Sequence, residues 1–325
     1  MFGAQLHNGV PYNPSIPKKV WRKVRKTIVV DSRDRQMNAG SHSGNYTVTL
    51  PTVYQNVYAA TLKSVEMPLS FYQFSAEANN VTLSFSYGTF GSESVPLVLT
   101  IPDGNYTESQ MKTALDAGFD AALAGSAPSG SVIVEFSSIT GKCQFTTNDV
   151  LTFYLTPSVP TSANCGSSLT TVSTTWWGLG YFLGFTPTTH TSGAILLPAT
   201  SATITANFAF NLFPINYVLL DLGALNKIDE TCLDDRKGAR VNGVFAKIPC
   251  DGNSGDYIYL TDTGAYQLNR TVFTPPVSKL TTLNIKFRLH DGRVINFNGV
   301  ENSFTLELEL LDNNFDEFSS VEFSV

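Results

Sequence analysis

Short segments in which apolar and polar residues alternate recur along most of this 325-residue chain. The clearest is the run VTLSFSY at 81–87, which is apolar at every odd position and stops at Gly88. Similar runs occur at 46–50 and 303–310. Alternation with a period of two residues, bounded by glycine or proline, is typical of strands that bury one face. The chain therefore has to fold mainly as β-structure, with roughly sixteen or seventeen strands.

One amphipathic helix interrupts the strands. Thr107 and Gln110 have the spacing of a capping box, in which a hydroxyl and an amide satisfy unpaired backbone donors of the first turn. Apolar residues then recur at every fourth position, at Met111, Leu115, Phe119 and Leu123. This spacing predicts a helix with one buried face that continues to about residue 124. Gly125 and Pro128 end it.

The number of strands suggests how the chain divides. Eight strands make one jelly roll, so this count predicts two. We expect an all-β fold with two tandem jelly-roll β-sandwiches (a double jelly roll), one inserted α-helix and an extended N-terminal arm. The expected parts are a basic arm at 1–27, a first jelly roll with the helix insertion at 28–213, a second jelly roll at 214–312 and an acidic tail at 313–325. One jelly roll with a large insertion is the alternative.

Charge is distributed unevenly along the chain. Residues 1–35 hold eight basic and two acidic side chains, whereas residues 36–325 hold 13 basic and 25 acidic ones. The basic run surrounds Trp21 and consists of Lys18, Lys19, Arg22, Lys23, Arg25 and Lys26. Docking onto an acidic protein neighbour is our main interpretation of this run. Contact with nucleic-acid phosphates, contact with anionic lipid heads through Trp21, and a solvated leader are alternatives. We expect no specific nucleic acid partner.

No arrangement of residues in the sequence indicates catalysis. The nucleotide-binding, metalloprotease and serine-hydrolase motifs are absent, and the four histidines lie far apart. The loop at 251–256 has alternating oxygen donors but lacks the spacing and bidentate glutamate of an EF-hand, so we interpret it as a glycine-rich turn. The four cysteines are widely spaced and are expected to be free thiols. We expect no catalytic residue, cofactor or metal, and no enzyme activity. No apolar run is long enough to span a membrane.

Trp176 and Trp177 form an aromatic pair beside Gly178. Paired aromatic residues next to glycine usually pack in a core or an interface. We therefore include both tryptophans, with the basic run, among the candidate interface residues. A stacking platform for sugars is the less favoured interpretation.

Several short motifs resemble those of a known family, in the same order along the chain. They are VVDSRDR at 29–35, YTVTLP at 46–51, LKSVEMP at 62–68, IPDGNYT at 101–107, LGF at 183–185, and a closing pattern from 276 to 304. Together they resemble minor capsid proteins of the double jelly-roll type from nucleocytoplasmic large DNA viruses, the giant viruses and chloroviruses of algae and protists. The basic run precedes the matched region, so its role depends on charge alone.

The resemblance implies a structural protein of the virion. It would lie in the inner layer of the capsid, be made in the host cytoplasm, and bridge or cement the major capsid capsomers from inside. Its expected partners are the major capsid protein and other minor capsid proteins, with the inner membrane as a further contact of the basic arm. The alternatives are a vertex or penton-like capsid protein with one jelly roll and an insertion, and a carbohydrate-binding jelly-roll module for attachment to the host.

Overall fold

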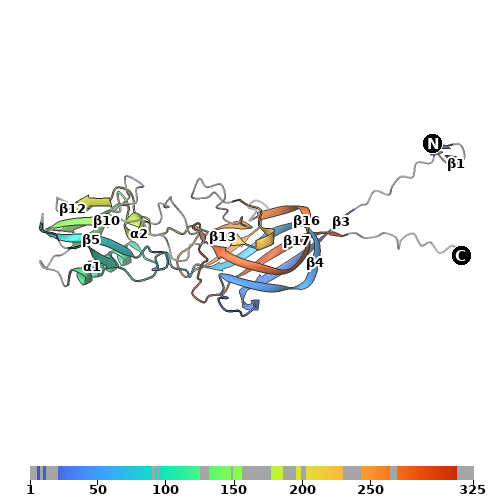
Figure 1. Cartoon of the computed structure of the whole chain (residues 1–325), viewed down its shortest axis with the longest axis horizontal. Coiled ribbons are helices and arrows are strands. Elements are labelled where there is room, and N and C mark those ends of the chain that lie inside the picture. The colour runs from blue at the N-terminus through green and yellow to red at the C-terminus, as the bar shows by residue number, and fades with distance from the viewer. Residues whose placement is uncertain are drawn as a thin grey trace.

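The computed structural model describes residues 6–7, 10–11, 21–89, 92–93, 95–124, 132–147, 149–155, 177–185, 195–198, 203–229, 243–263 and 269–312 (Figure 1). The strands of this part of the chain are β1 (Leu6–His7), β2 (Val10–Pro11), β3 (Arg22–Asp31), β4 (Asn45–Pro68), β5 (Thr82–Thr89), β6 (Ser92–Glu93), β7 (Leu97–Thr100), β8 (Val132–Phe136), β9 (Cys143–Thr147), β10 (Val150–Leu155), β11 (Ile195–Pro198), β12 (Thr203–Thr205), β13 (Tyr217–Asp221), β14 (Ala246–Pro249), β15 (Tyr257–Thr261), β16 (Asn269–Arg288) and β17 (Ser303–Asp312). The helices are α1 (Glu108–Leu123) and α2 (Gly178–Phe182), with single 3-10 turns at Ser32–Asp34 and Gly223–Leu225.

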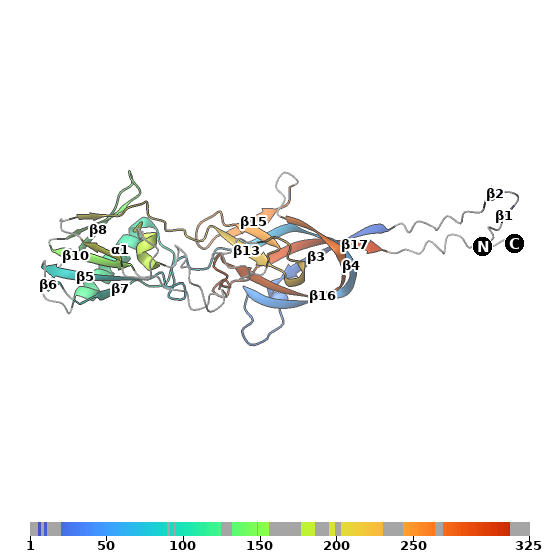
Figure 2. The same cartoon turned by 45° about the horizontal axis from the view of Figure 1, so that its top comes forward.

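Seven strands from both ends of the chain form one curled antiparallel sheet, which we call the body. Its order is β14-β13-β16-β4-β17-β3, and β15 pairs with the end of β4. The central strand β4 lies between β16 and β17, so Tyr46 is opposite Ile285 and Val65 is opposite Phe304. The curl is visible in Figures 1 and 2. Apolar side chains of these strands, among them Leu62, Val65, Ile285 and Phe304, are buried together as one core.

Prolines lie where the two longest strands change register. Between Thr49 and Tyr54, β4 takes five steps while β16 takes two, from Thr282 to Leu280, and Pro51 lies in the longer stretch. Farther along, β16 contains the extra residues, which include Pro275 and Pro276. Proline cannot donate to a strand ladder and is tolerated at bulges, which bend a sheet. The strand that contains the alternating run at 46–50 therefore passes through Pro51 and continues to Pro68.

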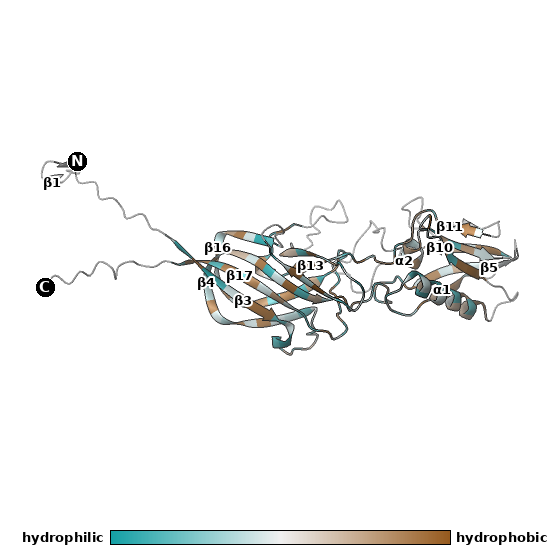
Figure 3. Ribbon diagram, turned by 180° about the vertical axis from the view of Figure 1, so that it is seen from behind, coloured by the Kyte–Doolittle hydropathy of each residue, from teal (hydrophilic) through white to brown (hydrophobic). Residues whose placement is uncertain are grey.

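The described residues between 74 and 212 form a second unit with its own core, which we call the insertion. One of its sheets has the order β11-β10-β5-β6 with β7 paired to β5, and the other has the order β12-β9-β8. Phe119 of α1 is completely buried, with ring centroids 5.0 Å from Phe85, 5.8 Å from Phe145 and 6.5 Å from Phe153. Figure 3 shows hydrophobic residues interspersed with polar ones along the strands of both units, as the sequence alternation predicts.

The locally determined elements agree with the sequence analysis. The capping box of α1 is present, since the Thr107 hydroxyl accepts from the Gln110 N–H and the Gln110 amide oxygen accepts from the Thr107 N–H. The apolar face of the helix is buried. The hairpin of β8 and β9 also forms, with Val132 opposite Thr147. The short helix α2 was not expected, although its glycine at 178 has a φ of 70°, which suits that residue.

The chain does not divide into two tandem jelly rolls at residue 213. Buried residues from Ile28 to Phe71 share a core with those from Val218 to Leu308, and residues between them form the other core. The physical reason is that β4 pairs with β16 and β17 across more than two hundred residues. The fold is mostly β, with a curled antiparallel sheet and few helices. Figures 1 and 2 show the insertion at one end of the body.

Truncation of Phe119 tests the core of the insertion. Phe119→Ala removes a fully buried ring that contacts three other rings, so we expect a loss of about 3–5 kcal/mol in the free energy of unfolding. Urea unfolding followed by circular dichroism measures it. Phe208→Ala is the control, because that side chain is 59% exposed and should change stability by about 0.5 kcal/mol or less. Equal losses for the two variants would contradict this description of the core.

Candidate functional site

Most of the basic run belongs to a strand at the edge of the body. Arg22, Lys23, Arg25 and Lys26 lie in β3 with exposed side chains, and β3 pairs with β17. The expectation of an arm that extends to residue 27 therefore needs correction, because the strand begins at Arg22. A strand forms here in spite of the charges, because the side chains of Val24, Ile28 and Val30 lie on one face of it. Ile28 and Val30 are buried in the core on that face. Lys18 and Lys19 lie outside the described residues.

Acidic residues of β17 face the basic residues across the strand pair. Arg25 lies opposite Glu309, and Arg22 lies opposite Asp312. Glu309 is only 6% exposed and forms an ion pair of 3.1 Å with Arg270 of β16. Opposite charges on neighbouring strands stabilise a sheet pair modestly. The basic run is thus partly balanced within the chain, and it begins next to the point where β17 ends.

The acidic tail predicted from the sequence begins at residue 313, so the acids at 307 and 309 were not among the candidate residues. Their specific role as partners of the basic strand was missed. The available signal was their position in the strictly alternating segment 303–310, which places both carboxylates on one face of the strand. The partner strand could not be identified in the same way, because alternation says nothing about which strands lie next to each other.

A group of polar contacts, which we call the clasp, holds the end of β3 to the start of β17. It consists of Ser32, Arg35, Glu301 and Asn302. Arg35 donates to both carboxylate oxygens of Glu301 at 2.8 and 2.7 Å, and the Ser32 hydroxyl donates to Glu301 at 2.5 Å. The Asn302 N–H donates to the Ser32 hydroxyl at 2.9 Å. These residues explain the motif at 29–35 as a structural element.

Ionisation of the carboxylates supports the same arrangement. Burial opposes the charge of Glu301, but hydrogen bonds from Arg35 and Ser32 and the positive charge of Arg35 outweigh it, so the pKa of Glu301 is lowered. The hydrogen bond from Arg33 lowers the pKa of Asp31. Burial raises the pKa of Tyr46, whose hydroxyl donates to Asn302 at 3.1 Å. The clasp is therefore a charged network at neutral pH, and it fixes the far end of the basic strand.

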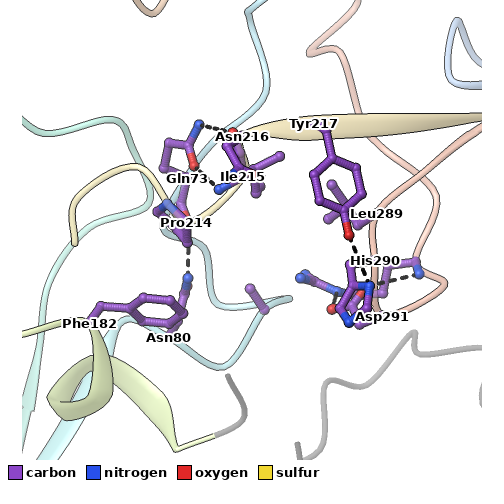
Figure 4. Close-up of a pocket in the computed structure, with 12 residues that line it drawn as sticks. Gln73, Asn80, Phe182, Pro214, Ile215, Asn216, Tyr217, Leu289, His290 and Asp291 are labelled. Atoms are coloured by element: carbon purple, nitrogen blue, oxygen red, sulfur yellow. Dashed lines mark hydrogen bonds and ion pairs between the residues drawn. The ribbon is translucent and has the colours of Figure 1, made fainter. Parts of the chain in front are cut away.

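The junction between body and insertion is held by amide side chains (Figure 4). Gln73, where the chain enters the insertion, accepts from the Ile215 N–H at 2.9 Å and donates to the Ile215 carbonyl at 3.3 Å. Asn80 donates to the Gln73 carbonyl at 2.9 Å. Asn105 of the motif at 101–107 accepts from the Gln73 N–H at 2.6 Å and donates to the Phe71 carbonyl at 3.0 Å. The entering and leaving segments are thus joined directly.

A cavity of about 160 Å³ lies at this junction. Figure 4 shows that residues of both units line it, including Phe182 from the insertion and Leu289 from the body. Its polar residues are already paired, since Tyr217 bonds to His290 at 3.0 Å and Arg293 bonds to Asp291 at 2.7 Å. An apolar space with internally satisfied polar groups fits a packing gap better than a binding site.

The remaining sequence candidates that the structure describes are buried or take part in local turns. Trp177 is 2% exposed and packs in the core of the insertion. The prediction that it lies at an interface is therefore wrong, and its ring is not available for stacking on sugars. Trp176 lies outside the described residues. Cys143 and Cys250 are free thiols, and burial raises the pKa of Cys250 to about 12. In the loop at 251–256, Asp256 accepts from the Asn253 N–H at 2.9 Å.

No three His, Cys, Asp or Glu side chains among the described residues gather as metal ligands. No helix in that part of the chain is both long enough and apolar enough to cross a bilayer.

Removal of one carboxylate tests the clasp. A lowered pKa means that ionised Glu301 stabilises the fold above its ordinary value near 4.5 and that this stability is lost as pH falls through the folded value. We expect Glu301→Gln to cost about 1–2 kcal/mol at pH 7 and to reduce the dependence of unfolding free energy on pH. Denaturant unfolding at pH 7 and pH 3 measures both. Glu135→Gln, on the exposed face of β8, is the control. A variant with an unchanged pH dependence would refute the assignment.

Comparison with known proteins gives the chain a relative. No family model matches. The chain is 32% identical over 96 residues to the penton capsid protein P1 of Paramecium bursaria Chlorella virus 1. These residues are 29% of this chain and 54% of the relative, so the chain spans about half the length of the curated protein that it matches. Among solved structures, the mavirus penton protein has a TM-score of 0.49 and 8% identity, covering 89% of this chain and 99% of that one.

This comparison corrects the family resemblance inferred from the short motifs. The assignment to double jelly-roll minor capsid proteins that bridge capsomers from inside is wrong, because the matching relative is a penton capsid protein. The single core that joins both ends of the chain agrees with this correction. The penton-like alternative of the sequence analysis is the better supported one. The expectation of a non-enzymatic structural protein is confirmed by the similarity to a viral capsid protein.

Proposed function

We propose that this chain is a penton protein that builds the vertices of the capsid of a large DNA virus. The observation that carries the proposal is the 32% identity to a penton capsid protein from a chlorovirus. A penton is the unit at a fivefold vertex, so copies of the chain would surround a fivefold axis. The proposed location is the virion, with other capsid proteins as partners.

The arrangement of the two units supports this function. The body has a single core closed by strands from both ends of the chain, and the insertion leaves it through two adjacent segments joined at Gln73 and Ile215. A rigid body with a second unit at one end suits a capsomer. The sides of the body can contact neighbouring capsid proteins, while the unit at the end stays clear of those contacts. The insertion then projects from the vertex, and the neighbouring capsid proteins contact the body.

The position of the start of β3 and the end of β17 indicates how the body could be oriented in the shell. Arg22 and Asp312 are register partners at the end of the body that is opposite the insertion (Figures 1 and 2). We propose that this end faces the inside of the shell. The basic residues of β3 then contact acidic capsid neighbours or the inner membrane surface, and their contribution falls with salt. No observation favours a carbohydrate-binding module, since Trp177 is buried.

The stoichiometry and position of the protein test the proposal. We expect the purified full chain to form particles of five copies, seen as fivefold class averages by electron microscopy. In a cryo-EM map of the intact virion, the body should fit the vertices, with the insertion outward. Density for the chain beneath the facets, and not at the vertices, would refute a penton role. A monomer in solution together with vertex density would show instead that assembly requires the neighbouring capsid proteins.

A further inference from the structure

The body has an unpaired sheet edge along its basic strand. β3 is ten residues long and pairs with β17 on one side, and no described residue pairs with its other side. An edge of this length presents a row of unpaired N–H and C=O groups that can accept another strand. Natural proteins usually protect such edges by charge, by bulges or by a covering segment. The question is therefore which segment covers β3.

Charge protects only half of this edge. The first half carries Arg22, Lys23, Arg25 and Lys26 with exposed side chains. The second half, from Thr27 to Val30, is uncharged, and the Val29 side chain is 72% exposed. A strand that added to this edge would need acidic residues beside the first half and apolar residues beside the second.

The acidic tail has this composition in this order. Residues 313–325 include Asp316 and Glu317 near the start, and contain no basic residue. They close with the alternating segment VEFSV at 321–325, which has the period of a strand. Aligned parallel to β3 with Phe323 beside Val29, the tail places Asp316 and Glu317 beside Arg22 and Lys23. Addition of a strand to a sheet edge is an established mode of peptide recognition.

The geometry favours the tail of another copy. The tail of the same chain leaves β17 at Asp312, so β3 lies between it and the unpaired edge. To reach that edge it would have to cross the chain where it enters β3 at Trp21, and connections rarely cross in this way. A tail from a neighbouring copy approaches the edge from outside without such a crossing.

We propose that residues 313–325 of one copy pair with the β3 edge of the next copy. The contact is heterologous, because it joins two different surfaces, and repeated around an axis it closes into a ring. The closed ring rests on the proposed penton function, whereas the pairing of tail and edge rests on the structure of the body. The acids and bases that meet in this contact make it weaker at high salt.

Disulfide trapping between full-length variants tests the exchange. Val29→Cys and Phe323→Cys are made in separate chains of different tag size and mixed under mild oxidation. We expect a linked dimer that contains both tags, and loss of this band in 1 M salt. A second pair with Val321→Cys covers a two-residue difference in register. Wild-type mixtures report any link through native cysteines, and Ile133→Cys, half exposed on the insertion, should not link to the tail.

A charge swap provides the second measurement. Lys23→Glu should reduce the trapped fraction several-fold, because Lys23 lies beside Glu317 when Phe323 lies beside Val29, and Glu317→Lys in the partner chain should restore it. A stabilising role of Lys23 within its own chain, where it lies over the Tyr58 ring, would not be rescued in this way. The paired variants thus separate recognition of the tail from a folding defect.

The outcomes separate this inference from the proposed function. Fivefold particles without any cross-link would overturn the tail exchange and leave the penton role standing. In a further variant that carries both Val29→Cys and Phe323→Cys, a link formed only within single chains would also overturn it, because it would show that each tail covers its own edge. Cross-linked chains that form no fivefold particle and are missing from virion vertices would support the exchange and refute the penton role.

Discussion

The pairing of β4 with β16 and β17 is the constraint on which the rest of the structure depends. These strands come from opposite ends of the chain and contribute the inner face of one core, from Leu62 to Leu308. Everything between them must therefore leave the body and return to it. The compensating bulges around Pro51 and Pro275 let the two longest strands curl while they keep their register at both ends.

Two consequences of this pairing shape the molecule. The insertion is attached through two neighbouring segments, so a few amides such as Gln73 and Asn105 are enough to fix it. The start of β3 and the end of β17 also meet, which brings the basic and acidic ends of the chain to one place. A division into tandem domains would have separated these charges. The pairing of β3 with β17 therefore determines where on the body a partner of these charged strands can bind.

The basic run illustrates how tertiary structure changes the meaning of a charge pattern. By itself the run suggests an extended arm that docks onto an acidic neighbour, but Arg25 is half of a cross-strand pair and Lys23 lies over the Tyr58 ring at 4.3 Å. These basic residues form part of a sheet edge and also contact or pair with residues of neighbouring strands. The same structure removes Trp177 from consideration as a binding residue, since this side chain is buried at the start of α2.

The sequence by itself determined the local elements. Thr107 and Gln110 predict the helix start, and the alternation at 81–87 predicts β5, because both signals depend on residues within a few positions of each other. It also indicated a non-enzymatic capsid protein. Only the tertiary structure decided that Ile28 shares a core with Leu308 and that Glu301 closes on Arg35. The physical reason is that alternation shows which face of a strand is buried but not which distant strand lies beside it, and that choice depends on packing and register across the whole chain.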